Sequence, residues 1–293
     1  MPEGKIMKAL SGFYYVKDHD QIIQCRGRGI FRKQKITPLV GDYVVYQAEN
    51  DLEGYVTEIK ERKNELMRPP VANVDQAVLV FSAIEPAFST SLLDRFLVLV
   101  ESHHISPVIC ISKMDLLSQE ETEKIEKFAV QYEGIGYTVI RSSAKWEDGL
   151  TSLLPYLEGK ISVFAGQSGV GKSSILNALR PDLELKTDQI SSSLGRGKHT
   201  TRHVELWSIG SGLVADTPGF SALEFSELEL EELPGCFPEI ADYGERCKFR
   251  GCLHINEPKC AVKKAVEENE IPAYRYHHYQ QFYDEIKTRK PRY

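Results

Sequence analysis

The chain has 293 residues, a net charge of −6 and an apolar content of 42%. These values predict two or three folded domains and argue against a protein that coats nucleic acid indiscriminately. No apolar run approaches the roughly 20 residues of a membrane span, and the first ten residues lack the apolar core of a signal peptide, so we expect a cytoplasmic protein that does not enter a membrane.

Residues 1–68 are rich in short strand-like segments separated by Gly and Asp turns, which predict a small β-barrel. The segments lie at 10–16, 21–26, 42–46 and 54–59. Basic residues and one aromatic residue lie between strands, namely Arg26, Arg28, Phe31, Arg32, Lys33 and Lys35. Such a mixture suits RNA phosphates and a stacked base, although it is also typical of a solvated face. Residues 66–70 are predicted to be a linker, because they end in two prolines.

Two loops after predicted strands are suited to read a guanine base. The apolar run 107–111 leads into Ser112-Lys113-Met114-Asp115, and the run 136–140 leads into Ser142-Ser143-Ala144-Lys145. The Asp115 carboxylate can accept the ring N–H and the exocyclic amine of guanine, a donor pair that adenine lacks, while the stem of Lys113 covers the ring. The second loop resembles the one with which GTPases offer a backbone N–H to the base carbonyl.

The most specific motif is the glycine-rich segment at 166–174. Its sequence fits the phosphate-binding pattern GxxxxGK[ST] and lies between an apolar run at 161–165 and an apolar-faced helix. The segment is Gly166-Gln167-Ser168-Gly169-Val170-Gly171-Lys172-Ser173-Ser174. Its backbone N–H groups can close around the β-phosphate, Lys172 can reach the β- and γ-phosphates, and the Ser173 hydroxyl can ligate Mg²⁺. We therefore expect a bound GTP or GDP with Mg²⁺.

Two later segments fit the loops that respond to a γ-phosphate. Residues 195–202 are polar and glycine-rich, and we interpret them as a first switch in which Thr201, or Thr200, closes on Mg²⁺; a merely flexible loop is the alternative. In the Asp-Thr-Pro-Gly motif, Asp216 is suited to hold Mg²⁺ through water and the Gly219 N–H to sense the γ-phosphate. Phe220 stands where many GTPases carry a water-orienting Gln, so we expect slow intrinsic hydrolysis.

The order of these motifs predicts a circular permutation. The base-reading loops precede the phosphate loop, whereas ordinary GTPases have the reverse order. Joining residue 220 back to residue 71 restores the usual succession of strands. The chain after residue 220 then follows the second switch directly, without the helix that normally anchors it. Residues 226–229 resemble a capping box and predict a new helix there.

The C-terminal part carries a metal-binding pattern. Four residues with short spacing form a Cys₃His set suited to one tetrahedral structural Zn²⁺: Cys247, Cys252, His254 and Cys260. Zinc can contribute on the order of 10 kcal/mol of folding free energy to so small a module. Cys25, Cys110 and Cys236 are expected to be packed thiols. The aromatic-rich helix at 274–283 is predicted to pack on the metal module rather than to form a stacking platform.

With these motifs, the chain resembles the circularly permuted small ribosomal subunit biogenesis GTPases, the RsgA (YjeQ/YloQ) family, over essentially its whole length. The resemblance implies a multi-domain α/β protein. Its domains are an N-terminal OB-fold RNA-binding barrel (1–68), a circularly permuted P-loop GTPase domain (71–222) and a zinc-binding helical C-terminal module (223–293). Ser112 departs from the Asn that GTPases generally carry, which predicts a weaker tether between the base-reading and phosphate loops.

The resemblance also implies a function. It implies a monomeric GTPase that binds the small (30S) ribosomal subunit and its rRNA and assists late maturation. Hydrolysis, stimulated by the subunit, would drive release. His199 is then the candidate hydrolytic residue beside Lys172 and Thr201, with an exposed loop histidine as the alternative. An RNA-binding assembly scaffold with a structural nucleotide remains open, and an ATP-using kinase is disfavoured by Asp115.

Overall fold

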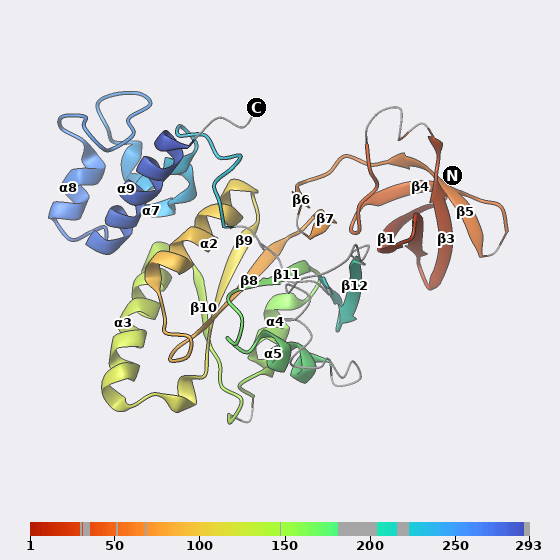
Figure 1. The fold of residues 1–293 in the computed structure, drawn as a ribbon, viewed down its shortest axis with the longest axis horizontal. Coiled ribbons are helices and arrows are strands. Elements are labelled where there is room, and N and C mark those ends of the chain that lie inside the picture. The colour runs from red at the N-terminus through yellow and green to blue at the C-terminus, as the bar shows by residue number, and fades with distance from the viewer. Residues whose placement is uncertain are drawn as a thin grey trace.

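The computed structural model describes residues 1–29, 31, 36–50, 52–67, 69–146, 148–180, 204–215 and 223–289. Figure 1 shows three lobes: a β-barrel near the N-terminus, a central α/β region, and a helical module that contains the C-terminal residues. Several predicted site residues lie outside the described ranges: Arg32, Lys33, Lys35, His199, Thr200, Thr201, Asp216, Gly219 and Phe220. None of the helices in the described ranges combines the length and apolar character needed to cross a lipid bilayer.

Five strands close the N-terminal barrel. β1 pairs with both β2 and β4, and β5 pairs with β3 and β4, so the sheet returns on itself. Alternate residues of these strands, among them Ile6, Val16 and Val56, are completely buried inside. The strands are β1 (Glu3–Leu10), β2 (Phe13–Asp18), β3 (Gln21–Gly27), β4 (Tyr43–Ala48) and β5 (Glu53–Ile59).

Three predictions for this lobe need correction. The segment 10–16 is not one strand, because Ser11 and Gly12 have positive φ angles of 50° and 84° and form the turn between β1 and β2. Phe31, expected to stack on a base, is only 7% exposed and packs in the core. Residues 66–70 are not an irregular linker. Leu66 and Met67 belong to β6 (Glu65–Met67) and Pro70 to β7 (Pro70–Ala72), and the two strands pair antiparallel. Pro70 is the first residue of its strand, a position at which the missing N–H is tolerated.

The central sheet has the strand order β10-β9-β8-β11-β13-β12. All neighbours are parallel except β12, which is antiparallel to β13 at the end of the series. β11, the first strand in the succession that the predicted rejoining restores, lies between β8 and β13. The strands that precede it in the chain (β8, β9 and β10) therefore lie on one side and those that follow it (β13 and β12) on the other, as the permutation requires. The strands are β8 (Gln76–Ser82), β9 (Ser106–Ser112), β10 (Thr138–Arg141), β11 (Ile161–Ala165), β12 (Val204–Ile209) and β13 (Gly212–Ala215).

Helices cover both faces of this sheet. Along β8, Leu79 and Phe81 pack with residues of α2 and α3, whereas Val78 and Val80 pack with residues of α5. α3 starts with a full capping box between Ser118 and Glu121, which defines its first turn. The elements are α2 (Thr90–Ser102), α3 (Gln119–Ile135), α4 (Leu154–Leu157), α5 (Lys172–Leu179) and the 3₁₀ turns η1 (Met114–Leu116) and η2 (Thr151–Leu153).

The barrel is joined to the central sheet through a strand pair. β1 is antiparallel to β12, with Lys8 opposite Glu205 and Ala9 opposite Val204. The Lys8 ammonium lies 3.1 Å from the Glu205 carboxylate, and both side chains are partly exposed. The barrel strands and the central strands thereby form one sheet of 11 strands.

The C-terminal module consists of short helices around an apolar centre. Tyr279, Phe282 and Tyr283 on α9 are at least 91% buried, which confirms that the aromatic helix packs rather than presenting a stacking platform. Cys236 is buried, as are Cys25 and Cys110, in agreement with the predicted packed thiols. The elements are η4 (Leu233–Cys236), α7 (Pro238–Gly244), α8 (Ala261–Glu267) and α9 (Ala273–Thr288).

The predicted helix at 226–229 is absent, and that prediction was wrong. Within residues 223–232, which the structure describes, no helix begins before η4. The backbone carbonyls of Phe225 and Leu228 accept hydrogen bonds from the Arg289 guanidinium, so they do not serve a helical ladder.

A buried ionic network joins this module to the central lobe. Arg275 on α9 is fully buried; it donates to Asp94 of α2 at 2.6 Å and makes two hydrogen bonds to Glu239 of α7. His278 Nδ1 lies 2.6 Å from the second oxygen of Asp94, and the Tyr132 hydroxyl of α3 donates to the first. All five members of the network are at least 91% buried.

Candidate nucleotide and metal sites

The phosphate-binding segment is a tight turn from β11 into α5. Gly166 has a φ angle of 134°, and a Cβ atom there would lie 2.1 Å from the Val80 carbonyl oxygen. Gly171, with a φ angle of 98°, directly precedes Lys172, the first residue of α5. Glycine is therefore required at both positions, and the α5 N-terminus, with Ser173 and Ser174 in its first turn, faces the loop with free N–H groups.

Lys172 is positioned inside this loop. Its ammonium donates to the carbonyl oxygens of Gly166, at 2.7 Å, and Gln167, and the residue is 8% exposed. Burial lowers its pKa to about 8. An amine held in this way gains electrostatic stabilisation when an anionic phosphate replaces the carbonyl oxygens.

The two predicted base-reading loops meet in the structure. Ser143 donates to an Asp115 carboxylate oxygen at 2.6 Å, and the Lys145 ammonium lies 3.3 Å from the other oxygen. The hydrogen bond from Ser143 is the main cause that lowers the pKa of Asp115, and Lys145 contributes less. Asp115 is therefore an ionised acceptor held at the junction of the loops, as recognition of the guanine donor pair requires. A backbone hydrogen bond also joins the two loops, from the Met114 N–H to the Ser142 carbonyl at 3.3 Å. Ala144 stands in the chain between Ser143 and Lys145, the two residues that contact Asp115.

Ser112 connects the base-reading loop to the phosphate loop. Its hydroxyl oxygen is buried and lies 2.5 Å from the Val170 carbonyl oxygen. Although serine is shorter than the asparagine that GTPases generally carry here, Ser112 reaches the phosphate loop, because that loop lies close to the end of β9. Lys113, with a φ angle of 61°, donates to the carbonyl of Glu85 in the loop after β8. The structure therefore gathers residues 112–115, 142–145 and 166–174 at the carboxyl ends of parallel strands, where open α/β sheets bind ligands.

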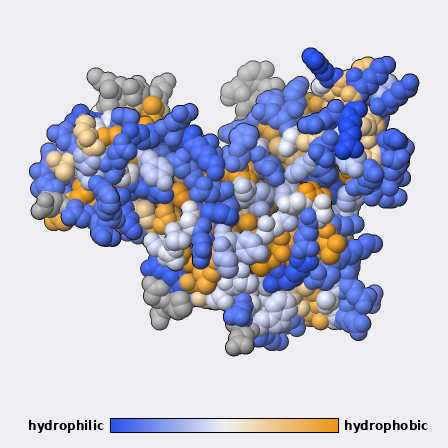
Figure 2. Space-filling model, turned by 180° about the vertical axis from the view of Figure 1, so that it is seen from behind, coloured by the Kyte–Doolittle hydropathy of each residue, from blue (hydrophilic) through white to orange (hydrophobic). Residues whose placement is uncertain are grey.

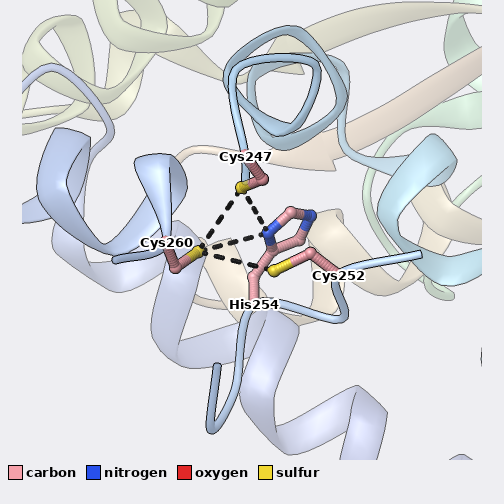
Figure 3. Close-up of side chains that lie close together, drawn as sticks. All are labelled: Cys247, Cys252, His254 and Cys260. Carbon is pink, nitrogen blue, oxygen red and sulfur yellow. Dashed lines mark hydrogen bonds between the residues drawn. The ribbon is translucent and has the colours of Figure 1, made fainter. Parts of the chain in front are cut away.

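The four predicted zinc ligands converge in the C-terminal module, as Figure 3 shows. Their donor atoms all lie within 4.8 Å of one another. The Cys247 and Cys260 sulfurs are 3.8 Å apart, those of Cys252 and Cys260 are 3.9 Å apart, and His254 Nδ1 is 3.6 Å from Cys247. Tetrahedral zinc, with bonds of about 2.3 Å to sulfur and 2.0 Å to nitrogen, spaces its ligands by roughly 3.5–3.8 Å, so the residues fit this ion.

The groups around these ligands orient them. The hydroxyl of Tyr276 donates to the His254 carbonyl at 2.6 Å, and that of Tyr279 donates to the Leu253 carbonyl at 2.7 Å. The Glu257 carboxylate accepts the N–H groups of Leu253 and Ile255. Burial raises the pKa of the Cys252 thiol to about 12, so metal binding must displace a thiol proton. No sequence pattern indicated the role of Glu257, whereas Tyr276 and Tyr279 belong to the aromatic helix that was predicted to pack on the metal module.

Known proteins resemble this chain over its full length. The RsgA N-terminal domain model matches residues 3–56, and the RsgA GTPase model matches residues 59–226. Proteins named small ribosomal subunit biogenesis GTPase RsgA from Bacillus velezensis and Bacillus subtilis are 68% and 65% identical, with complete coverage of both chains.

Two solved structures share the fold. The crystal structure of YloQ, a circularly permuted GTPase, is 61% identical with a TM-score of 0.87 and covers 100% of this chain and 97% of its own. The crystal structure of YjeQ from Thermotoga maritima is 39% identical with a TM-score of 0.88 and 99% coverage of both. Together with the strand order, this likeness confirms the predicted permutation.

Proposed function

The chain belongs to the RsgA family of GTPases, and we propose that it hydrolyses GTP in the biogenesis of the small ribosomal subunit. The observation that supports this most directly is the Ser112–Val170 hydrogen bond, because it joins the loop of Asp115 to the loop of Lys172. One guanine nucleotide can then contact both loops. Kinase chemistry with ATP has no support, since the ionised Asp115 has no donor pair to accept from adenine.

The roles of the individual site residues follow from this assignment. Lys113, Met114, Asp115, Ser143, Ala144 and Lys145 would contact the base, and residues 166–174 would hold the phosphates. Ser173, Thr201 and Asp216 would hold Mg²⁺, which neutralises phosphate charge when bound, and Gly219 would sense the γ-phosphate. We assign His199, with Lys172 and Thr201, to hydrolysis, since Phe220 cannot orient a water molecule.

We further propose that the two outer lobes contact rRNA. On the barrel, the Arg26 guanidinium lies 5.0 Å from the ring centre of Phe13, and the Lys5 ammonium lies 4.6 Å from that of Tyr43. Arginine beside an accessible ring suits phosphates and stacked bases. On the face of the molecule seen in Figure 2, hydrophilic residues predominate on both outer lobes and hydrophobic residues form scattered patches.

The zinc module offers a second surface of this kind. Between Cys247 and Cys252, Phe249 is 45% exposed and is flanked by Lys248 and Arg250. The Lys248 ammonium lies 5.7 Å from the ring centre of Phe249, and within the described residues neither cation is ion-paired. Zinc would fix both ends of this loop and thus its shape. The domain division 1–68, 71–222 and 223–293, a monomeric state and a cytoplasmic location complete the proposal.

A turnover assay with purified small subunits tests the function. We expect subunits to stimulate GTP hydrolysis by orders of magnitude, because phosphoryl transfer gains on the order of 10³–10⁵ from positioning groups that a partner can supply or order. His199→Ala is expected to remove most of this stimulation, while His103→Ala, a substitution outside the loops, serves as the matched histidine control.

Binding to subunits completes the test. Co-sedimentation is expected with a GTP analogue and not with GDP, because hydrolysis is proposed to drive release. Binding without stimulated turnover would contradict the enzymatic role and favour an assembly scaffold with a structural nucleotide. Equal binding with both nucleotides would contradict the release step.

A further inference from the structure

A short segment, residues 223–229, connects the second switch motif to the zinc module. It starts four residues after Gly219, and we call it the strap. It has no regular secondary structure, yet Phe225 and Leu228 are only 3% and 5% exposed. Something other than a helical ladder therefore holds the strap in place.

Arg95 of α2 holds the first half of the strap. Its guanidinium donates to the Leu223 carbonyl at 3.0 Å, and its centre lies 4.6 Å from the ring centre of Phe225 and 4.8 Å from that of Phe282. The same guanidinium makes two hydrogen bonds to the Glu285 carboxylate of α9, one of them 2.8 Å long. A single side chain of the central lobe thus binds both the strap and α9.

Arg289 holds the second half. It donates to the carbonyls of Phe225 and, at 3.0 Å, Leu228, and it lies 3.2 Å from a Glu229 carboxylate oxygen. Since Arg289 directly follows α9, it fastens the strap to the zinc module, whereas Arg95 fastens the strap to α2 as well. The Arg95 contacts connect the strap to the domain that carries the nucleotide loops.

We propose that Arg95 is a positioning residue for the GTPase reaction, anchoring the chain behind the second switch in place of the helix lost through permutation. The inference rests on the proposed function. Four peptide units span at most about 14 Å, so an anchor at Leu223 limits where Gly219 can move. If Leu223 is already fixed, fewer backbone dihedral angles must be ordered when the Asp-Thr-Pro-Gly motif contacts a γ-phosphate, and the entropy cost of that contact is smaller. GDP, which has no γ-phosphate, gains nothing from the anchor.

Arg95→Gln tests this prediction through nucleotide selectivity. We expect the variant to bind a non-hydrolysable GTP analogue about fivefold or more weakly, in the range typical of coupling between two sites, and to bind GDP as the wild type does. Intrinsic turnover should fall in parallel. Fluorescent analogues of both nucleotides give the two dissociation constants, and their ratio is the readout that a general loss of stability does not change.

The control is Arg62→Gln. Arg62 has the same kind of environment: it binds the Asp42 carboxylate with two hydrogen bonds, donates to the Thr37 carbonyl and has a side-chain exposure of 20%, against 23% for Arg95. Arg62 lies at the barrel and does not contact the strap. We expect Arg62→Gln to leave the GTP-analogue to GDP ratio unchanged. Equal ratios in both variants would overturn the proposal.

Two further variants keep the test decisive. Arg95→Lys retains the charge near Glu285 but cannot reach Leu223 and stack between two rings at once, so we expect an intermediate ratio. If Arg95→Gln does not fold, Phe225→Leu removes the ring contact while keeping an apolar side chain, and an unchanged ratio there overturns the proposal. Wild-type protein without subunit-stimulated hydrolysis would refute the proposed function, whereas the analogue-to-GDP ratios would still decide the role of Arg95.

Discussion

The barrel and the zinc module are joined to the same central lobe by different kinds of contact. The barrel is attached through the backbone ladder of β1 and β12, with one partly exposed ion pair beside it. The zinc module is attached through side chains, at the centre of which Arg275, Asp94 and Glu239 are at least 91% buried. A strand pair is held by backbone N–H and C=O groups, which nearly every residue carries, so it tolerates changes of side chain. A buried ionic network depends on each member, because a charge left alone there has no water to replace its partner.

The largest effect is expected from the loss of a zinc ligand. Cys260→Ser should unfold the zinc module and leave the barrel folded, since zinc contributes on the order of 10 kcal/mol to such modules and the barrel has its own core. Hydrogen exchange resolved by segment would show fast exchange in 223–289 and protection in 3–59. Cys236→Ala, at a buried cysteine outside the metal set, should keep both zinc and protection. Protection of the module in Cys260→Ser would contradict this expectation.

The next effect concerns the buried network. Arg275→Leu leaves Asp94 and Glu239 without their cation and is expected to lower the free energy of unfolding by about 3–5 kcal/mol. Denaturant titration followed by fluorescence measures it. Arg275→Leu/Glu239→Leu should recover part of the loss, because one unpaired carboxylate is removed with the cation. A loss of less than about 1 kcal/mol in the single variant would mean that this junction is no more sensitive than an exposed ion pair.

The nucleotide site gives a readout that neither junction should influence. Burial lowers the pKa of Lys172 to about 8 in the free protein, and a bound phosphate must raise it again. GDP affinity should therefore be constant below pH 8 and fall above it, up to about tenfold per pH unit, because binding then requires uptake of a proton. Titrations between pH 7 and pH 9.5 check this. Lys8→Ala should give the same profile as the wild type, and a flat wild-type profile would contradict the assignment.

The smallest effect is expected at the barrel junction. Lys8→Ala removes an ion pair whose side chains are 29% and 33% exposed, so the free energy of unfolding should change by less than about 1 kcal/mol. Lys60→Ala, which removes an ion pair with Glu3 within the barrel, is the control. A loss near 3 kcal/mol for Lys8→Ala alone would show that side chains secure this junction as well.

Local signals explain which parts of the molecule could be predicted. The phosphate loop, the Asp115 loop and the zinc ligands are runs of specific residues at fixed spacing, and the strands around them are continuous apolar runs. The partners of Arg275 could not be predicted, because Asp94 lies 181 residues away and a charged residue on a helix ordinarily indicates solvent exposure. The capping-box pattern at 226–229 failed for a related reason: a distant arginine, Arg289, occupies the carbonyls that a helix would need.

The pairing of β1 with β12 has a consequence for communication within the molecule. Val204, the residue of β12 that pairs with Ala9 of the barrel, is the second residue after the candidate first switch at 195–202. On the other side, the zinc module is reached through Leu223, four residues after the Asp-Thr-Pro-Gly motif. Each outer lobe therefore follows a different one of the two segments proposed to respond to the γ-phosphate, and a change at the nucleotide would have two separate routes outward.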